Sequence, residues 1–317
     1  MTALLVMAEC GPGIGLGHVM RTLAVAEAAR DAGWNATLVS PELPPNVEAR
    51  LKAAGIRRAA PGAPLPSADA MLVDGYGFAP PLLADWRGHT GCLAVMDDNG
   101  EHRGTPVDLV INPNPHAGPA LYDGWTGPEF RLGSAYAPLR KEFRTSAAAV
   151  PPEARRILVT LGGSDPLQLT GHIINSLQDI EDRLEITAVL GGMAAEPEMR
   201  PEGRHAVTLL RDVADMSALM RRAGMAISAA GSSLWELAHL GVPTIALTVA
   251  ENQVAAAKAA ADQGMLLLAT RETVAREARR LLGDDARRGA LAAAGRQLVD
   301  GRGAERIMEA IAGFRRS

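Results

Sequence analysis

Short apolar runs rich in β-branched residues alternate with amphipathic stretches along the whole chain. This alternation is typical of parallel sheets whose strands are joined by crossover helices, so the sequence predicts an α/β protein. In the first half, the predicted strands are Leu4–Met7, Ala36–Val39, Met71–Val73, Leu93–Met96 and Leu109–Ile111. In the second half, they are Ile157–Leu161, Ile186–Leu190, Val207–Leu210, Met225–Ser228, Thr244–Leu247 and Met265–Leu268.

The stretch between the two series, from Arg144 to Glu153, has no strand pattern and contains paired prolines. Paired prolines favour an extended connector, so we expect two Rossmann-like domains, residues 1–147 and 148–317. The region Arg271–Arg315 is helical in pattern, with breaks at Gly283 and at Gly301-Arg302-Gly303. The last helices of this region could pack on the first domain.

Composition narrows the partners that we expect. The 317 residues are 47% hydrophobic and carry a formal net charge of −4, which allows two compact cores. No general basic field is present to hold nucleic acid or an anionic membrane, so any phosphate must be bound locally. No apolar run reaches the roughly 20 residues of a membrane span, and the first residues resemble a buried strand, not a signal peptide. Cys10 and Cys92 lie in no metal-binding or CxxC spacing. We therefore expect a cytoplasmic protein with two reduced thiols.

A glycine-rich turn follows the first predicted strand and leads into a helix at His18. Glycines such as Gly15 and Gly17 permit close backbone approach, and the start of a helix attracts anions. A dinucleotide fingerprint is not favoured, because its third glycine is absent and no acidic residue ends the second strand. A free imidazole has a pKa of about 6.5 and can accept a proton at neutral pH. His18 is therefore a candidate general base, or alternatively a histidine that caps its own helix.

Two loops of the second half open a helix directly after a strand. The first contains Gly163 and Ser164, followed by a capping aspartate, and could hold the edge of a nucleotide. The second contains Gly231, Ser232 and Ser233, whose backbone amides are suited to a diphosphate.

Three polar side chains near these loops have both a functional and a local interpretation. Glu236 could accept hydrogen bonds from two ribose hydroxyls, or could complete a capping box with Ser233. Asn252 and Gln253 follow another strand, and their amides are suited to sugar hydroxyls, although helix capping by Glu251 or Asn252 is an alternative.

The adjacent carboxylates of Asp97 and Asp98 suggest a divalent metal, but without a histidine ligand pattern such pairs are more often loop and cap residues. We predict no metal site and no cofactor. The remaining histidines have no ligand spacing and are assigned structural or surface roles: His89, His102, His116, His172, His205 and His239.

Taken in order, these motifs resemble one family, the PseG UDP-sugar hydrolases of the pseudaminic acid pathway, which are related to the MurG glycosyltransferase. The matching segments run nearly end to end: Ile14–Arg21, Asp74–Tyr76, Asp97-Asp98, Asp108–Asn114, Gly133–Phe143, Leu161–Asp165, Ala230–Leu237, Gly241–Pro243 and Glu251–Gln253.

The resemblance implies a GT-B fold with two parallel sheets facing across a cleft, the UDP held by the second domain and the sugar facing the first. It adds Val213 to the nucleotide-binding residues. It implies metal-independent hydrolysis of a UDP-linked diacetamido-trideoxyhexose. In such enzymes the residue matching His18 activates water against the anomeric carbon, which releases UDP and a free sugar with inversion. Tyr76 and Asn252 would position sugar and water.

The chain departs from the family after the first strand, where members commonly carry an arginine and an aspartate and this sequence has Met7-Ala8-Glu9-Cys10. That loop lines the sugar side, so a GT-B glycosyltransferase with a UDP-sugar donor and a soluble small-molecule acceptor is the alternative. A nucleotide-sugar sensor without catalysis is a third hypothesis, which the presence of His18 disfavours.

Overall fold

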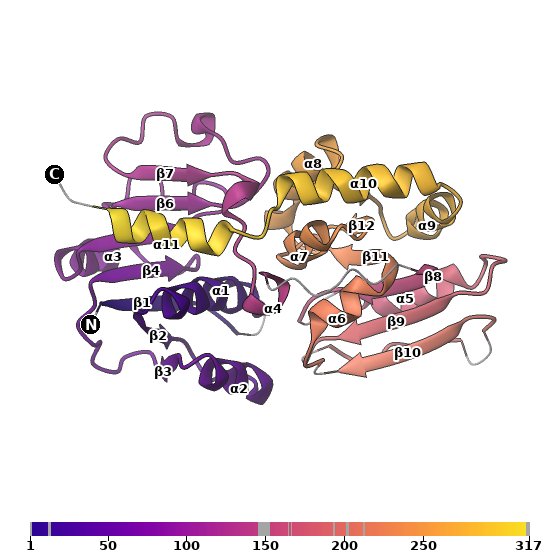
Figure 1. The fold of residues 1–317 in the computed structure, drawn as a ribbon, viewed down its shortest axis with the longest axis horizontal. Helices are drawn as coiled ribbons and strands as arrows, with labels where there is room; N and C mark the ends of the chain where they lie inside the picture. Colours follow the sequence, from indigo (N-terminus) through magenta and orange to yellow (C-terminus); the bar gives the residue numbers. More distant parts are fainter. Residues whose placement is uncertain are drawn as a thin grey trace. The chain divides into compact units, whose positions relative to one another are not determined.

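The computed structural model describes residues 2–11, 14–144, 153–163, 165, 167–192, 194–200, 203–211 and 213–314. The chain forms two compact units. The first contains Met1–Arg144 together with Gly301–Ser317, and the second contains Thr145–Asp300. Each unit is a parallel sheet with helices packed on it (Figure 1).

The sheet of the first unit has seven strands in the order β3-β2-β1-β4-β5-β6-β7, all paired in parallel. Because β1 lies between β2 and β4, the winding direction changes beside β1, and the loops after β1 and β4 lie together at the carboxyl edge. The strands are β1 (Ala3–Ala8), β2 (Asn35–Val39), β3 (Arg57–Ala59), β4 (Ala70–Asp74), β5 (Cys92–Met96), β6 (Leu109–Asn112) and β7 (Glu129–Leu132).

The five strands predicted for this half are confirmed, because their apolar residues are buried on both faces of the sheet, as parallel strands require. The hydrophobic pattern of the sequence does not predict β3 and β7. Both are short and carry charged residues, such as Arg57 in β3 and Glu129 in β7, so neither shows an apolar run.

Helices of the first unit cover this sheet, and α1 packs against α11. Leu23 and Val25 of α1 share one core with Ile307 and Ile311 of α11. The last helix therefore belongs to the first unit. The helical segments are α1 (Gly17–Asp31), α2 (Pro45–Ala53), α3 (Pro80–Gly88), η1 (Pro119–Tyr122), η2 (Ser134–Tyr136), α4 (Lys141–Arg144) and α11 (Gly303–Gly313).

The second unit repeats the design with a six-stranded parallel sheet in the order β10-β9-β8-β11-β12-β13. Its strands are β8 (Glu153–Thr160), β9 (Glu185–Leu190), β10 (Ala206–Arg211), β11 (Ala223–Ala229), β12 (Thr244–Leu247) and β13 (Leu267–Leu268). Its helices are α5 (Leu169–Leu177), α6 (Met216–Arg221), α7 (Ser233–Leu240), η3 (Glu251–Gln253), α8 (Val254–Asp262), α9 (Val274–Leu282) and α10 (Asp285–Leu298).

The predicted strands of this half are also confirmed, and α9 ends at Gly283 as its pattern indicates. The predicted connector at 145–152 lies outside the described residues. Cys10 and Cys92 are both free thiols. Over the described part of the chain, no helix combines the length and apolar character that crossing a bilayer requires.

Candidate functional site

His18 is held by a buried carboxylate at the carboxyl edge of the first sheet. It is near the start of α1, and its Nδ1 lies 2.6 Å from Oδ1 of Asp74, the last residue of β4. Burial would raise the pKa of Asp74, but the charge of Arg21 and hydrogen bonds from Arg21 and His18 lower it below its ordinary value. An ionised carboxylate only accepts hydrogen bonds, so Nδ1 carries the proton and Nε2 of the neutral ring carries the lone pair.

Arg21 lies one helical turn after His18 and joins two carboxylates. Its Nε and Nη2 donate to Asp74 at 2.6 and 2.7 Å, and its Nη1 and Nη2 donate to Asp98 at 2.8 and 3.0 Å. Burial would lower the pKa of Arg21, but both carboxylates raise it well above its ordinary value. The guanidinium therefore fixes Asp74 and Asp98 side by side through bidentate bonds.

Tyr76 connects the loop after β4 to the same group of residues. Its hydroxyl donates to Asp98 Oδ2 at 2.9 Å, and its ring meets the His18 ring edge to face at a centroid distance of 4.9 Å. Asn114 donates to Asp98 Oδ1 at 2.8 Å. We call His18, Arg21, Asp74, Tyr76, Asp98 and Asn114 the His18 cluster.

The His18 cluster holds two ionised carboxylates and one guanidinium. Burial raises and Arg21 lowers the pKa of Asp98, with further lowering by Asn114 and Tyr76, and the result is far below its usual range. Together these three groups carry a net negative charge. Among the described residues Nε2 has no hydrogen-bond partner. His18 is only 7% exposed, so little of its side chain is open to solvent or to a ligand.

Asp97 has a different role from its neighbour. Its carboxylate accepts from the backbone N–H groups of Gly100 and His102, and burial followed by a hydrogen bond with Glu101 raises its pKa to about 6. The loop and cap interpretation thus fits Asp97, whereas Asp98 belongs to the His18 cluster. No group of three or more potential metal-ligating side chains occurs in the residues that the structure describes.

Two of the histidines assigned structural roles support the loops beside the His18 cluster. His116 Nε2 lies 3.0 Å from the Asp98 carbonyl. His102 is buried, which lowers its pKa, and it hydrogen-bonds the backbone of Gly75.

The glycine-rich loop before His18 is a tight turn. Gly15 has φ +78° and its N–H donates to the Gly11 carbonyl at 2.9 Å. Gly17 is exposed at the start of α1, where no side chain caps the helix. The first N–H groups of a helix have no acceptor within the helix, and the anion site predicted at this helix start stays a prediction.

In the second unit, the loops after β8 and β9 touch through glycine backbones. A Cβ on Gly191 would overlap the backbone of Gly163. The Asp165 side chain is used within its own loop, where it accepts from the N–H groups of Leu169 and Thr170 at 2.9 Å each. Ser164 lies outside the described residues.

The loops after β11 and β12 bring other predicted residues together. Gly231 and Gln253 are adjacent, because a Cβ on Gly231 would lie 4.0 Å from Gln253 Nε2. The residue before α7 is Ser232, so Ser233 is the first residue of the helix and not the N-cap position that a capping box requires. Glu236 is half-buried in the first turn.

Two further predicted residues of this unit, Asn252 and Val213, lie in other segments. Asn252 is exposed in η3. Val213 is half-buried between β10 and α6.

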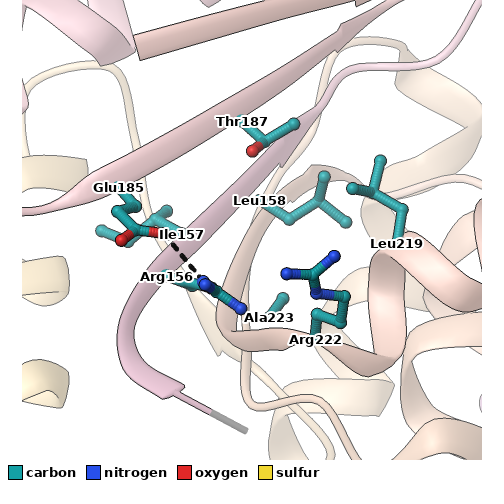
Figure 2. A pocket seen from close by; sticks show the side chains of 8 residues that line it. All are labelled: Arg156, Ile157, Leu158, Glu185, Thr187, Leu219, Arg222 and Ala223. Carbon is teal, nitrogen blue, oxygen red and sulfur yellow. Dashed lines mark hydrogen bonds and ion pairs between the residues drawn. The ribbon is translucent and has the colours of Figure 1, made fainter. Parts of the chain in front are cut away.

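A pocket of about 170 Å³ in the second unit lies at the opposite, amino edge of the sheet (Figure 2). The side chains of Leu158 and Leu219 line it, and Arg156 is paired there with Glu185 at 2.8 Å. None of the predicted site residues lines it.

From the sequence we predict functional roles for His18 and Tyr76 and a loop or cap role for Asp98, whereas Arg21 and Asp74 appear only within segments that match the PseG family. One signal was present: Arg21 is three residues after His18, which places both side chains on one face of a helix. Asp74 and Asp98 are recognisable only once the strand order is known.

Comparison with known proteins supports the fold. No family model matches the chain. It is 18% identical to MurG of Acinetobacter baumannii, with a TM-score of 0.67 over 99% of this chain and 100% of MurG. Against the MnaA–UDP structure of S. aureus, identity is 14% and the TM-score is 0.69, over 98% of this chain and 96% of MnaA. The fold is therefore GT-B, of the kind found in MurG.

Curated relatives also match at the level of sequence. The chain is 33% identical over 196 residues to the spore coat polysaccharide biosynthesis protein SpsG of Bacillus subtilis, covering 58% of this chain and 56% of SpsG. It is 24% identical over 278 residues to the pseudaminic acid cytidylyltransferase and UDP-2,4-diacetamido-2,4,6-trideoxy-beta-L-altropyranose hydrolase of Helicobacter pylori, covering 86% of this chain and 49% of that protein. The chain spans about half the length of the curated relatives it matches.

Proposed function

We propose that the protein hydrolyses a UDP-linked amino-deoxy sugar of the diacetamido-trideoxyhexose type to UDP and the free sugar. The observation that carries the proposal is the hydrogen bond between His18 Nδ1 and Asp74, because it leaves Nε2 as a base. The substrate class is supported by the Helicobacter pylori relative, whose name includes this hydrolase activity.

In the proposed reaction, Nε2 of His18 takes a proton from a water molecule whose oxygen bonds to the anomeric carbon. The bond between that carbon and the phosphate oxygen breaks, and its electron pair leaves with UDP. Attack opposite the leaving group inverts the anomeric configuration. The net negative charge of the His18 cluster compensates the imidazolium that forms.

Tyr76 and Asn252 are proposed to position the sugar and the water. The Tyr76 proton is committed to Asp98, so towards a ligand its oxygen acts as an acceptor for a hydroxyl or amide N–H. This preference suits a sugar that carries acetamido groups.

The nucleotide is assigned to loop amides and nearby side chains. Helix-terminal amides stabilise charge on a departing diphosphate, so the proposed reaction needs no metal or cofactor. The proposed nucleotide-binding residues are Gly15, Gly17, Gly163, Ser164, Val213, Gly231, Ser232, Ser233, Glu236 and Gln253.

The test is incubation of the purified protein with UDP-sugars, with EDTA and without an acceptor. We expect UDP and free sugar in equal amounts. His18→Ala should abolish turnover and leave UDP affinity unchanged in calorimetry, whereas His89→Ala, at an exposed histidine, should leave both unchanged. An unchanged rate for His18→Ala would remove the imidazole from the mechanism.

The second candidate function is a GT-B glycosyltransferase with a soluble acceptor. It is favoured by the loop Met7-Ala8-Glu9-Cys10, which departs from the hydrolase pattern on the sugar side. Turnover that appears only after a nucleophilic acceptor is added would establish this function and exclude hydrolysis.

A further inference from the structure

Glu9, just after β1, holds the loop that carries Tyr76. Its Oε2 accepts the backbone N–H of Tyr76 at 2.7 Å, and its Oε1 accepts that of Gly77 at 3.0 Å. One carboxylate thus satisfies two successive amides of a loop that follows a different strand.

The loop is shaped to receive this side chain. A Cβ on Gly75 would overlap Glu9 Cγ, and a Cβ on Gly77 would overlap Glu9 Oε1. The absence of side chains at both positions therefore makes the space that Glu9 fills. A second side chain, that of His102, hydrogen-bonds the backbone of Gly75 in the same loop.

Fixing the backbone at Tyr76 also fixes its ring. The Tyr76 side chain is 43% exposed, yet its hydroxyl bonds Asp98 and its ring meets that of His18. Because the side chain is so exposed, the direction of the ring depends on the backbone beneath it as well as on these two contacts.

We propose that Glu9 is a positioning residue for Tyr76 and so determines how the sugar is placed against His18. The inference rests on the proposed function for its catalytic consequence, but the structural coupling of Glu9 to Tyr76 can be tested without turnover. It also gives a role to the residue that departs from the hydrolase pattern.

The structural test is ¹⁹F NMR of protein labelled with 3-fluorotyrosine at its three tyrosines, with Tyr76→Phe used for assignment. Glu9→Ala should shift or broaden the Tyr76 resonance and leave those of Tyr122 and Tyr136 in place. Glu9→Gln keeps the size of the side chain but replaces one acceptor by a donor, so it should give the same change. An unmoved Tyr76 resonance in both variants would overturn the proposal.

The kinetic test is a double-mutant cycle. Gly77→Ala should displace the Glu9 carboxylate and lower kcat by the same factor as Glu9→Ala, about 10- to 100-fold, because small misplacements of reacting groups cost that much. The double variant should lose no more than either single variant, and UDP affinity should stay unchanged throughout. Additive losses would show that Glu9 and Gly77 act independently and would overturn the proposal.

The control is Glu129→Ala, at an exposed glutamate of β7 that pairs with Arg131, which should change neither readout. If the wild type turns over no UDP-sugar, the proposed function fails. The NMR comparison then still decides whether Glu9 positions Tyr76.

Discussion

Asp74→Asn separates the role of Asp74 in catalysis from its role in stability. In the folded protein the Asp74 carboxylate accepts three hydrogen bonds, from His18 at 2.6 Å and from Arg21 at 2.6 and 2.7 Å. An amide offers one oxygen and one NH₂ group. At least one N–H group of His18 or Arg21 must therefore face the NH₂ group of the new asparagine, which is also a donor.

Either orientation of the new amide has a cost. If its oxygen faces His18, a charge-assisted bond to Arg21 is lost, which costs about 1.5–3 kcal/mol. If its NH₂ group faces His18, the ring adopts the other tautomer and Nε2 becomes a donor that cannot accept a proton. We expect kcat to fall by about 10²–10⁴, the range for loss of a general base, and the free energy of unfolding to fall by about 3 kcal/mol.

The assay is UDP release at saturating substrate, with urea unfolding and UDP calorimetry on the same samples. The matched control is Asp108→Asn. Asp108 is also buried, directly before β6, and accepts from Arg87 and from the Leu93 N–H, but it is not part of the His18 cluster. It should lose stability and keep kcat. A kcat within threefold of the wild type for Asp74→Asn would refute the prediction that the new amide turns its NH₂ group to His18 and removes the base.

Two further predictions concern pH and the second unit. Because burial and the hydrogen bond with Glu101 raise its pKa from 3.8 to about 6, folded Asp97 contributes stability that is full below about pH 4 and is lost as pH rises through about 6. Asp97→Asn should remove this component from urea unfolding curves measured at pH 5 and 8, and an unchanged difference between the two would contradict the assignment. Gly191→Ala should push the Gly163 backbone aside, weaken UDP binding about tenfold and cost about 1–3 kcal/mol of stability. Gly192→Ala, where a Cβ meets nothing within 4 Å, should leave calorimetric UDP affinity unchanged, and equal effects of the two would argue against the contact.

The sequence predicts the strands well because burial of a parallel sheet on both faces demands apolar runs, and such runs are visible without structural information. It fails at β3 and β7, whose charged residues hide short edge strands. The fold class follows from the alternation alone. The strand order does not, because no local pattern says that β1 pairs with β4.

In the candidate site too, some residues could be predicted from the sequence and others could not. His18 stands out because a histidine at the start of a helix has an obvious chemistry, and Tyr76 followed from the resemblance to a family. Their partners are harder to find. Asp74 is 56 residues away from His18 along the chain, and Arg21 reaches Asp98 over 77 residues. Such contacts depend on which strands are neighbours, so spacing in the sequence cannot reveal them.

The return of α11 to the first unit has a consequence for how the protein is made. Residues that complete this core, among them Ile307 and Ile311, are translated after the whole of the second unit. The unit that contains His18 is thus begun first and finished last, while the second unit can fold during synthesis as an insertion within it. In a ribosome-bound chain stopped near residue 300, α11 would not yet cover the apolar residues of α1 that it packs against, such as Leu23 and Val25, and chaperones that bind apolar surfaces could act at that stage.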